Sequence, residues 1–550
     1  MEVRGLLKLW NEWGMQILVL VSFLLQVFLL TFGGMRRRSS SAVLRVSLWL
    51  AYLLADSTAI YTLGHLSVVS GSHKHKLVAF WAPFLLLHLG GPENITAYAL
   101  EDNSLWLRHL QTLAVQVLGA AYVMYRYMAS SGTLLLLASI CMFAAGLLKY
   151  GERILALKRG NISSIRTNIN VIHYAKNPCD YLLQDTSEER ILRIAHSHLT
   201  ICKGLLTNYW IVHPKIEQCP INVAMNIYKL IEMELSLMYD ILYTKAAVIH
   251  TCEPAGKRLW KGSIGQYNFF HLCIHKRDTR NELGGRLAIT MRLEYWWNKL
   301  HCSGTDSFSV HDLKNLVLQA LPENSKDMYF KSRGRFILKE QMVYKDLARW
   351  SVNIEFDESI FVWHIATEVY ISQSKHAEAE HDQEKLIEAA KVMSNYMMFL
   401  LAVKPDMLPG RMDEDTFIRE SNKRDVDSTV SSLDVPSGSR MQQREEKLAQ
   451  EFFDMYHTHP KGDDKSYRSP DVERGVLLAK ELIDLGRHDT LELILGVWVE
   501  MVLYAAQQCR LDSHARQLSN GGEFMTIVWL LAHHFMPYDT VDIAIPKIED

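Results

Sequence analysis

The sequence predicts a mainly α protein in which an N-terminal transmembrane helix bundle of about five spans precedes a mostly helical soluble region. Three observations support this class. Residues 15–150 are dominated by Leu, Val, Ala and Phe, whereas residues 160–550 have the polar and charged mixture of a soluble chain. Apolar side chains recur at helical spacing through the second part. Strand signals are sparse there, and FILKE and NIEFDE are the two short runs that suggest a strand.

The first apolar segment, residues 15–33, matches a bilayer in length and carries no charge. A cleavable signal peptide is the alternative. It is disfavoured because Arg36, Arg37 and Arg38 follow where a small-residue cleavage site would stand. Four further apolar segments make up the rest of the predicted bundle: 46–68, 77–89, 110–128 and 133–149.

The third of these segments is short for a membrane helix. As a helix, residues 77–89 cover only about 20 Å, and Gly90-Gly91-Pro92 then ends the helix. The segment either crosses the bilayer with help from the polar loop that follows, or forms a re-entrant, broken helix. A full crossing is favoured and the re-entrant arrangement stays open.

The Lys/Arg distribution predicts a multi-pass protein with its N-terminus outside or luminal and its C-terminal half cytoplasmic. The sequons at Asn94 and Asn161 would then face the cytoplasm and stay unglycosylated. The predicted inner side holds most of the basic residues of this part of the chain: Arg36, Arg37, Arg38, Arg45, Arg108, Lys149, Arg153, Lys158 and Arg159.

Composition divides the chain into four regions: a transmembrane bundle (1–160), a cytoplasmic helical region (161–408), a flexible linker with one helix (409–470) and a C-terminal helical domain (471–540). The linker contains VDSTVSSLDVPSGSR, which has no apolar period, and its helix is predicted at REEKLAQEFFDMY. Residues 490–508 are apolar enough for a span. Glu492 and Glu500 would be expensive in a bilayer, so a buried helix is predicted instead.

Charge and motifs narrow the function classes. A net charge of −2 gives no support for a nucleic-acid partner. The eight cysteines contain no C-x-x-C pair, which favours reduced, structural thiols. His533-His534 and His196-x-His198 lack a glutamate at metalloprotease spacing, so no metal is predicted, and nothing points to a cofactor. The chain has no Walker loop, kinase, dinucleotide or G-x-S-x-G motif, which leaves enzymatic activity undecided and disfavoured.

Asp56 is the sharpest candidate for a functional residue, because a carboxylate inside a bilayer is by default a hypothesis for an ion or proton site. The alternative, which we favour, is a structural aspartate bonded inside the bundle. His88 beside Gly90-Gly91-Pro92 suggests a ligand loop, but a tight turn is the simpler interpretation. The predicted partners of Asp56 are Tyr52, His65, His88 and Gln116. The predicted lipid headgroup contacts are Arg36, Arg37 and Arg38.

Several long strings resemble a plant membrane family. LWLAYLLAD (48–56), HKLVAFWAPFLLLHLGGPENITAYALEDNSLWLRH (75–109) and KYGER (149–153) are similar to domain of unknown function 4220. VWVEMVLYAA (497–506) and SHARQLSNGGEFMTIVWLLAHH (513–534) resemble its usual companion, domain of unknown function 594. The resemblance implies a flowering-plant protein that crosses the membrane several times, and it implies no activity. Family members usually carry two further spans where CEPAGKRLWKG stands here, so the chain resembles a shortened member.

Together these observations favour a membrane-anchored interaction or regulatory protein whose partners are membrane lipid and a protein bound through the cytoplasmic half. The alternative is a component of a transporter or channel that uses Asp56. A membrane enzyme acting on lipids is a third hypothesis, supported only by unassigned His and Asp residues.

Overall fold

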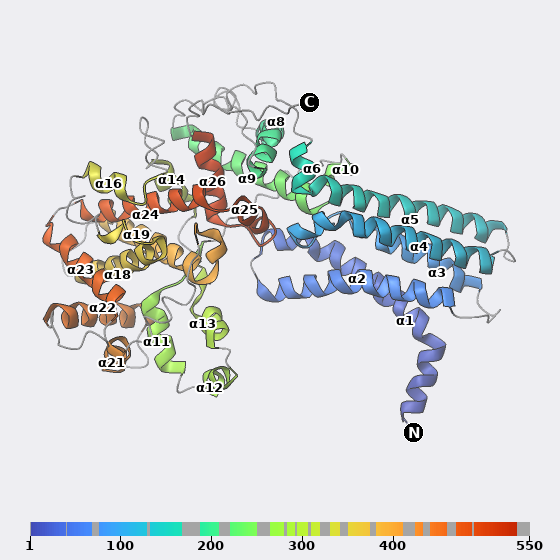
Figure 1. Ribbon diagram of the computed structural model, residues 1–550, viewed down its shortest axis with the longest axis horizontal. Coiled ribbons are helices and arrows are strands. Elements are labelled where there is room, and N and C mark those ends of the chain that lie inside the picture. Colours follow the sequence, from blue (N-terminus) through green and yellow to red (C-terminus); the bar gives the residue numbers. More distant parts are fainter. Residues whose placement is uncertain are drawn as a thin grey trace, which may run out of the picture. The chain divides into compact units, whose positions relative to one another are not determined.

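The computed structural model describes the chain in 17 stretches, and every structural statement below concerns these: 2–39, 41–68, 76–128, 133–167, 188–207, 221–249, 264–279, 283–291, 294–305, 310–319, 331–341, 350–374, 381–410, 424–432, 440–458, 469–486 and 489–535. They form two compact units (Figure 1). The first unit contains residues 1–214, 221–261 and 514–523, and the second contains most of the remainder.

The first unit begins with the five helices that the apolar segments predict. These are α1 (Glu2–Phe32), α2 (Ala42–Val68), α3 (Lys76–Leu89), α4 (Trp106–Met128) and α5 (Thr133–Gly160). Figure 1 shows α2 to α5 running side by side. α4 begins at residue 106 and not at 110, and α5 continues to 160 and not 149. Both helices therefore extend past the apolar segments that predict them, and the added turns carry charged residues.

Five helical stretches are long and apolar enough to cross a membrane: Trp13–Arg37, Ala42–Ser67, Thr133–Gly160, Gln383–Val403 and Thr490–Gln508. Three of them are α1, α2 and α5 of the bundle, whose large apolar side chains are widely exposed. The other two belong to the second unit and are mostly buried inside it. α3 is apolar but shorter, and α4 does not meet the same length and hydropathy test.

The short helix α3 fills the centre of the bundle. Its side chains Ala82, Leu85, Leu86 and Leu89 are buried against α2, α4 and α5. Gly146 of α5 permits a close approach, because a Cβ at this position would lie 2.9 Å from the backbone nitrogen of Leu87. The second half of α3, from Ala82 to Leu89, is therefore largely shielded by its neighbours.

The rest of the first unit is also helical. It contains the 3-10 helices η1 (Gly33–Arg37) and η2 (Leu100–Leu105), followed by α6 (Ile162–Thr167), α8 (Glu188–Leu206), α9 (Ile221–Tyr243) and α10 (Ala246–Ile249). α8 has one apolar face, since Ile191, Ile194 and Cys202 are buried where α8 packs on α9. Residues 514–523, far along the sequence, complete this unit.

The second unit is a helical domain with a minimal β-ribbon. β1 (Gly265–Gln266) pairs antiparallel with β2 (Gly304–Thr305), with Gly265 opposite Thr305. Its helices are α11 (Phe269–Thr279), α12 (Leu283–Thr290), α13 (Glu294–Cys302), α14 (Val310–Gln319), α16 (Arg335–Glu340), α18 (Phe356–Ser374), α19 (His381–Val403), η3 (Pro405–Met407), α21 (Arg424–Ser432), α22 (Met441–Thr458), α23 (Pro470–Asp484), α24 (Thr490–Gln508), the start of α25 (Leu511–Gln517) and α26 (Phe524–Phe535).

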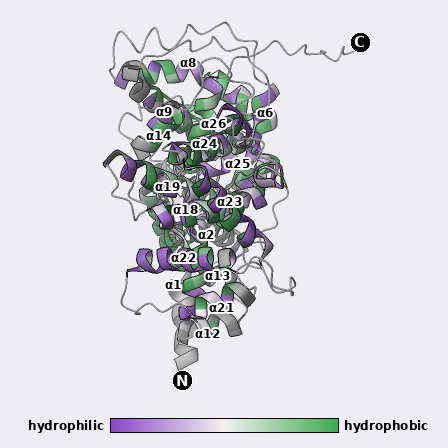
Figure 2. Cartoon of the chain, turned by 90° about the vertical axis from the view of Figure 1, so that its left-hand side faces the viewer, coloured by the Kyte–Doolittle hydropathy of each residue, from purple (hydrophilic) through white to green (hydrophobic). Residues whose placement is uncertain are grey.

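Large aromatic side chains fill the core of this unit. Trp363, Trp498 and Trp529 are each fully buried, on α18, α24 and α26. Figure 2 colours α24 and α26 as mainly hydrophobic and α22 as largely hydrophilic. Such burial explains how α24 can match a membrane span in composition while packing inside a globular unit.

Two local predictions differ from the structure. FILKE lies in the helix α16, and NIEFDE leads into the helix α18, so neither run forms a strand. Part of VDSTVSSLD forms α21, because Val426 and Val430, one helical turn apart, are both buried where α21 packs on α11 and α22.

Candidate functional site

The polar groups of the first unit gather at one end of the bundle, where α1, α3 and α5 end and α2 and α4 begin. We call it the loop end, and the loop that closes it spans residues 90–105. The last carbonyls of α3 and those of the loop have no helical partner and need hydrogen bonds from elsewhere. At membrane depth such groups are tolerated only where protein covers them.

Asp56 is paired with Arg153 of α5. The guanidinium Nη1 and Nη2 donate to Asp56 Oδ1 and Oδ2 at 2.8 and 2.9 Å, which is the bidentate arrangement. Nη1 also donates to the carbonyl of Leu89 at 2.9 Å. The Arg153 side chain is 3% exposed and that of Asp56 is 25% exposed. Asp56 is therefore a neutralised carboxylate, and the same cation caps the carboxyl end of α3.

Of the partners predicted for Asp56, Tyr52 belongs to the same group. The Arg153 guanidinium lies 5.6 Å from the centre of the Tyr52 ring, and the Tyr52 hydroxyl donates to the carbonyl of Thr96 at 3.3 Å. His65 instead contacts the ring of Tyr61. The sequence does not reveal Arg153 as the partner of Asp56, because the two residues are 97 positions apart.

His88 and Gln116 have separate surroundings. His88 is 7% exposed, and its Nδ1 lies 2.9 Å from the hydroxyl of Ser22 on α1. Gln26 donates to the His88 carbonyl at 3.0 Å. Gln116 is half-buried on α4 and forms no side-chain hydrogen bond within the described part of the chain. No described contact joins Asp56, His88 and Gln116, and whether any of them binds a ligand stays a prediction.

Arg36 is buried in a cage of aromatic rings and does not lie at an exposed surface. Its guanidinium donates to the carbonyls of Ala97 and Tyr98, each at 2.9 Å. It also lies within 5.7 Å of the ring centres of Tyr98, Tyr239 and Tyr243. Only 1% of the residue is exposed. This corrects the prediction of a lipid headgroup contact, because the protein itself surrounds this cation with rings and carbonyls.

Arg37 is likewise turned into the protein. It donates to Ser236 at 2.6 Å and to Asp240 at 3.2 Å, both on α9, and is 4% exposed. The headgroup prediction is therefore corrected for Arg37 too. Arg38 is exposed, and its contact with lipid stays a prediction.

The loop also pairs with the chain that follows α9. The Thr96 amide donates to the Tyr243 carbonyl at 2.9 Å, and the Lys245 amide donates to the Glu93 carbonyl at 3.0 Å. Asn103 donates to the carbonyl of Leu242 at 2.9 Å. These bonds hold the loop against the carboxyl end of α9.

Lys245 is a further buried cation of this network. Its Nζ donates to the carbonyls of Lys149 and Gly91 at 3.1 and 3.4 Å, and its side chain is fully buried. Burial, together with the charge of Lys149, lowers its pKa to about 8, which the Glu152 carboxylate only partly opposes. The Lys245 ammonium therefore donates hydrogen bonds to two backbone carbonyls, and it loses its own hydration by being buried.

Residues 514–523 close the network. The Tyr243 hydroxyl donates to the carbonyl of Ala515 at 3.1 Å, and Arg516 forms an ion pair with Glu101 of the loop at 2.7 Å. This part of the chain was predicted to lie within the C-terminal domain. A local sequence pattern carries no signal for such a distant contact.

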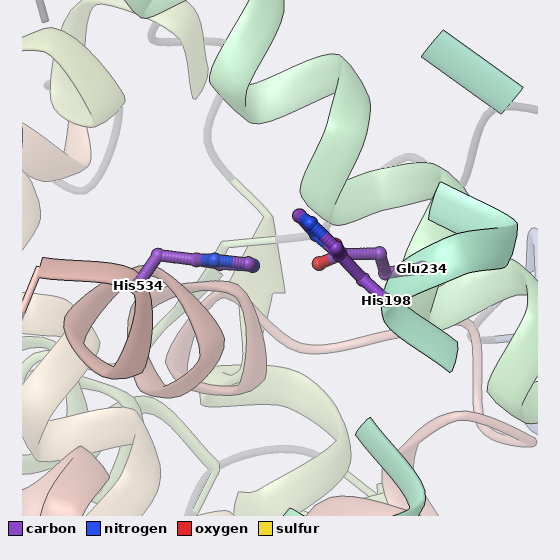
Figure 3. Close-up of side chains that lie close together, drawn as sticks. All are labelled: His198, Glu234 and His534. Carbon is purple, nitrogen blue, oxygen red and sulfur yellow. The ribbon is translucent and has the colours of Figure 1, made fainter. Parts of the chain in front are cut away.

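A second buried polar pair of this unit lies between α8 and α9. The His198 Nδ1 is 2.9 Å from a Glu234 oxygen, and the two side chains are 1% and 0% exposed (Figure 3). His196, the neighbour considered with His198, is exposed. Glu234 had not been singled out, because it lies 36 residues away on another helix. His533 and His534 lie on α26 of the second unit.

Residues 275–280 and 331–339 of the second unit each contain several basic side chains, and groups in both clusters make contacts inside the protein. Arg277 donates to the carbonyl of Val430 at 2.9 Å, and neighbouring Asp278 pairs with Arg444 at 2.8 Å. In the other cluster, the amides of Gly334, Phe336 and Ile337 donate to the buried carboxylate of Glu500. Glu500 is thus explained by backbone hydrogen bonds, which make a buried carboxylate tolerable.

The fold and the network define a helical protein whose apolar N-terminal bundle is closed at one end by a polar loop. Other groups of the same protein form hydrogen bonds with the backbone of this loop. Residues 49–256 match the family model described as Domain of unknown function (DUF4220), and residues 484–536 match Protein of unknown function, DUF594. Both matches agree with the resemblance described from the sequence. Comparisons with curated proteins and with solved structures found no match. The plant origin stays a prediction.

Proposed function

We propose that the chain is a membrane-anchored protein that acts through contacts with partner proteins, with its C-terminal half in the cytoplasm. The anchor is supported by the apolar helices α1, α2 and α5, whose outward side chains are large and exposed. The orientation is supported by the basic residues at the loop end. The orientation also agrees with the surroundings of the sequon residue Asn94. Its side-chain amide donates to the carbonyl of Leu30 at 2.7 Å and is therefore already occupied by a hydrogen bond.

The observation that carries this proposal is the bidentate pairing of Asp56 with Arg153. A carboxylate that moves protons or cations must lose and regain its charge partner, whereas this one is held by two short hydrogen bonds. Arg36 and Lys245 are bonded mainly to backbone carbonyls in the same way. Such a network positions a loop and the end of α9, which suits a protein that presents surfaces to partners.

A component of a transporter or channel is the second candidate. The specific observation in its favour is that Asp56 is still 25% exposed although its partner is buried. A cation that displaced Arg153 would find a carboxylate within reach of solvent.

Proximity labelling in cells, with the label at the C-terminus of the full chain, would separate the two candidates when combined with a flux assay. The labelled neighbours would be compared between the native chain and Asp56→Asn. The same two proteins would be purified and reconstituted in vesicles to measure proton and monovalent cation flux. Ser57→Ala, next to Asp56 and exposed, is the matched control.

The proposal expects cytosolic neighbours shared by all three chains, and no flux above that of empty vesicles. Flux that requires Asp56 and persists in Ser57→Ala would replace the proposal with the transport function. Luminal neighbours would overturn the orientation.

A further inference from the structure

Four basic side chains lie at the loop end, outside the network described above. Lys158 and Arg159 are in the last turn of α5, Arg166 is on α6 and Lys203 is on α8. We call them the basic edge. Lys158, Arg159 and Arg166 are exposed, and Lys203 is half-buried. α6 packs on both α5 and α8, so the three helices that carry the edge form one continuous surface.

Specific contacts fix two of these cations. The Lys158 ammonium lies 4.9 Å from the ring centre of Trp106, the first residue of α4. One Arg159 nitrogen, Nη1, donates to the carbonyl of Ala247 at 2.6 Å, which leaves the other nitrogens of this guanidinium available. Lys158 and Arg159 are therefore held in place by the protein.

Within the described part of the chain, no carboxylate forms an ion pair with the basic edge. From residue 154 to residue 167 the sequence contains Lys158, Arg159 and Arg166 and no Asp or Glu. Burial lowers the pKa of Lys203, and the charge of Arg159 lowers it further. Like charges held together without a carboxylate favour an anion between them.

Apolar side chains continue from the basic edge along the bundle. Leu148 and Leu155, two turns apart on α5, are 69% and 48% exposed. Leu107 and Leu110 near the start of α4 are 60% and 44% exposed. A surface with cations at the end of an exposed apolar stripe, and a tryptophan beside them, matches the headgroup level of a bilayer.

We propose that the basic edge binds the headgroup of an anionic phospholipid in the leaflet at the loop end, with its acyl chains along Leu148 and Leu155. Charge complementarity and the adjoining apolar stripe favour a lipid over a soluble anion, which would use only the cations. The site takes the place of the contacts predicted for Arg36 and Arg37, and it does not depend on the proposed function.

Binding of fluorescent phosphatidylserine to the purified full chain in neutral detergent tests this site, with phosphatidylcholine as the second ligand. The Lys158→Gln/Arg159→Gln double variant should bind phosphatidylserine roughly 30-fold more weakly, at about 1 kcal/mol for each cation near the surface. Arg126→Gln, an exposed arginine at the opposite end of α4, is the matched control and should change binding less than about twofold.

Two more variants keep the test decisive if the double variant does not fold, which the melting temperature of each variant reveals. Lys158→Arg keeps the charge and should keep binding. Arg166→Gln removes one exposed cation of the edge and should weaken phosphatidylserine binding about fivefold.

Equal affinity for the two lipids, or unchanged binding by the folded charge-removing variants, would overturn the proposal. Competition by free glycerol phosphate at the concentration of the lipid would assign the site to a soluble anion and would also overturn it.

Discussion

At the scale of single residues, the bundle depends on cations that are bonded to backbone carbonyls as well as to acids. Arg153 joins Asp56 to the end of α3, and Arg36 joins η1 to the loop. Each of them satisfies carbonyls that no helix can satisfy. Removing a partner therefore leaves a buried charge or an unpaired carbonyl, and both are unfavourable.

Asp56→Asn should lower the free energy of unfolding by about 3 kcal/mol, because Arg153 would stay buried without a counter-charge. Thermal unfolding of the full chain in detergent measures this loss. The double variant Asp56→Asn/Arg153→Met should recover part of the stability, since it removes the stranded charge. The single variant Arg153→Met completes the comparison. If the losses of stability from Asp56→Asn and Arg153→Met simply add in the double variant, the pair does not interact as the structure shows.

Lys245 should make stability depend on pH. Its pKa in the folded chain, about 8, lies below the ordinary value of 10.5, so the unfolded chain binds more protons between these values. Stability contributed by this residue should therefore rise as pH increases from 8 to 10.5, by a few kcal/mol at most. Comparing unfolding of the native chain and Lys245→Met across this range isolates the effect. Parallel curves for the two proteins would contradict it.

Residue-scale contacts were the least predictable part of the molecule. Asp56 was singled out because a carboxylate in an apolar segment is unusual, and a structural role was favoured. Its partner could not be found, because no local pattern links residues that are 97 positions apart. Arg36 and Arg37 were misassigned for a related reason, since a basic cluster after an apolar helix gives no sign that aromatic rings will cover it.

At the scale of helices, periodicity predicted much more. The apolar segments predicted α1 to α5, and the acids in α24 correctly indicated a helix buried in the second unit. Ends of helices were less certain, as α5 shows by continuing past its apolar part to Gly160. α21 was missed because two valines in a polar stretch are too few to show a period.

The contact between α3 and α5 should be sensitive to one methyl group. A Cβ at Gly146 would lie 2.9 Å from the Leu87 nitrogen, so Gly146→Ala should separate the helices and cost about 1–3 kcal/mol. Gly151→Ala on the same helix meets nothing within 4 Å and should stabilise by up to about 1 kcal/mol. Unfolding of both variants in detergent provides the comparison. A similar gain from both would show that α3 does not pack closely on α5.

At the scale of the whole molecule, the first unit is assembled from three separate parts of the sequence. Residues 221–261 and 514–523 join the bundle, although both lie beyond the apolar region. The predicted division at residue 160 follows composition, whereas the compact unit follows contacts such as Thr96 to Tyr243. Hydropathy alone does not show which helices from outside the apolar region pack against the bundle.

A fragment of residues 161–550 should therefore lose structure at the carboxyl end of α9. It would lack Glu93 and Thr96, whose backbone groups bond Lys245 and Tyr243. Hydrogen exchange of the Lys245 amide should accelerate in the fragment relative to the full chain, because its acceptor is gone. Amides near Leu230 should keep their protection, because that part of α9 is within the helix that packs on α8. Equal exchange at Lys245 in both proteins would mean that the bundle does not hold the end of α9.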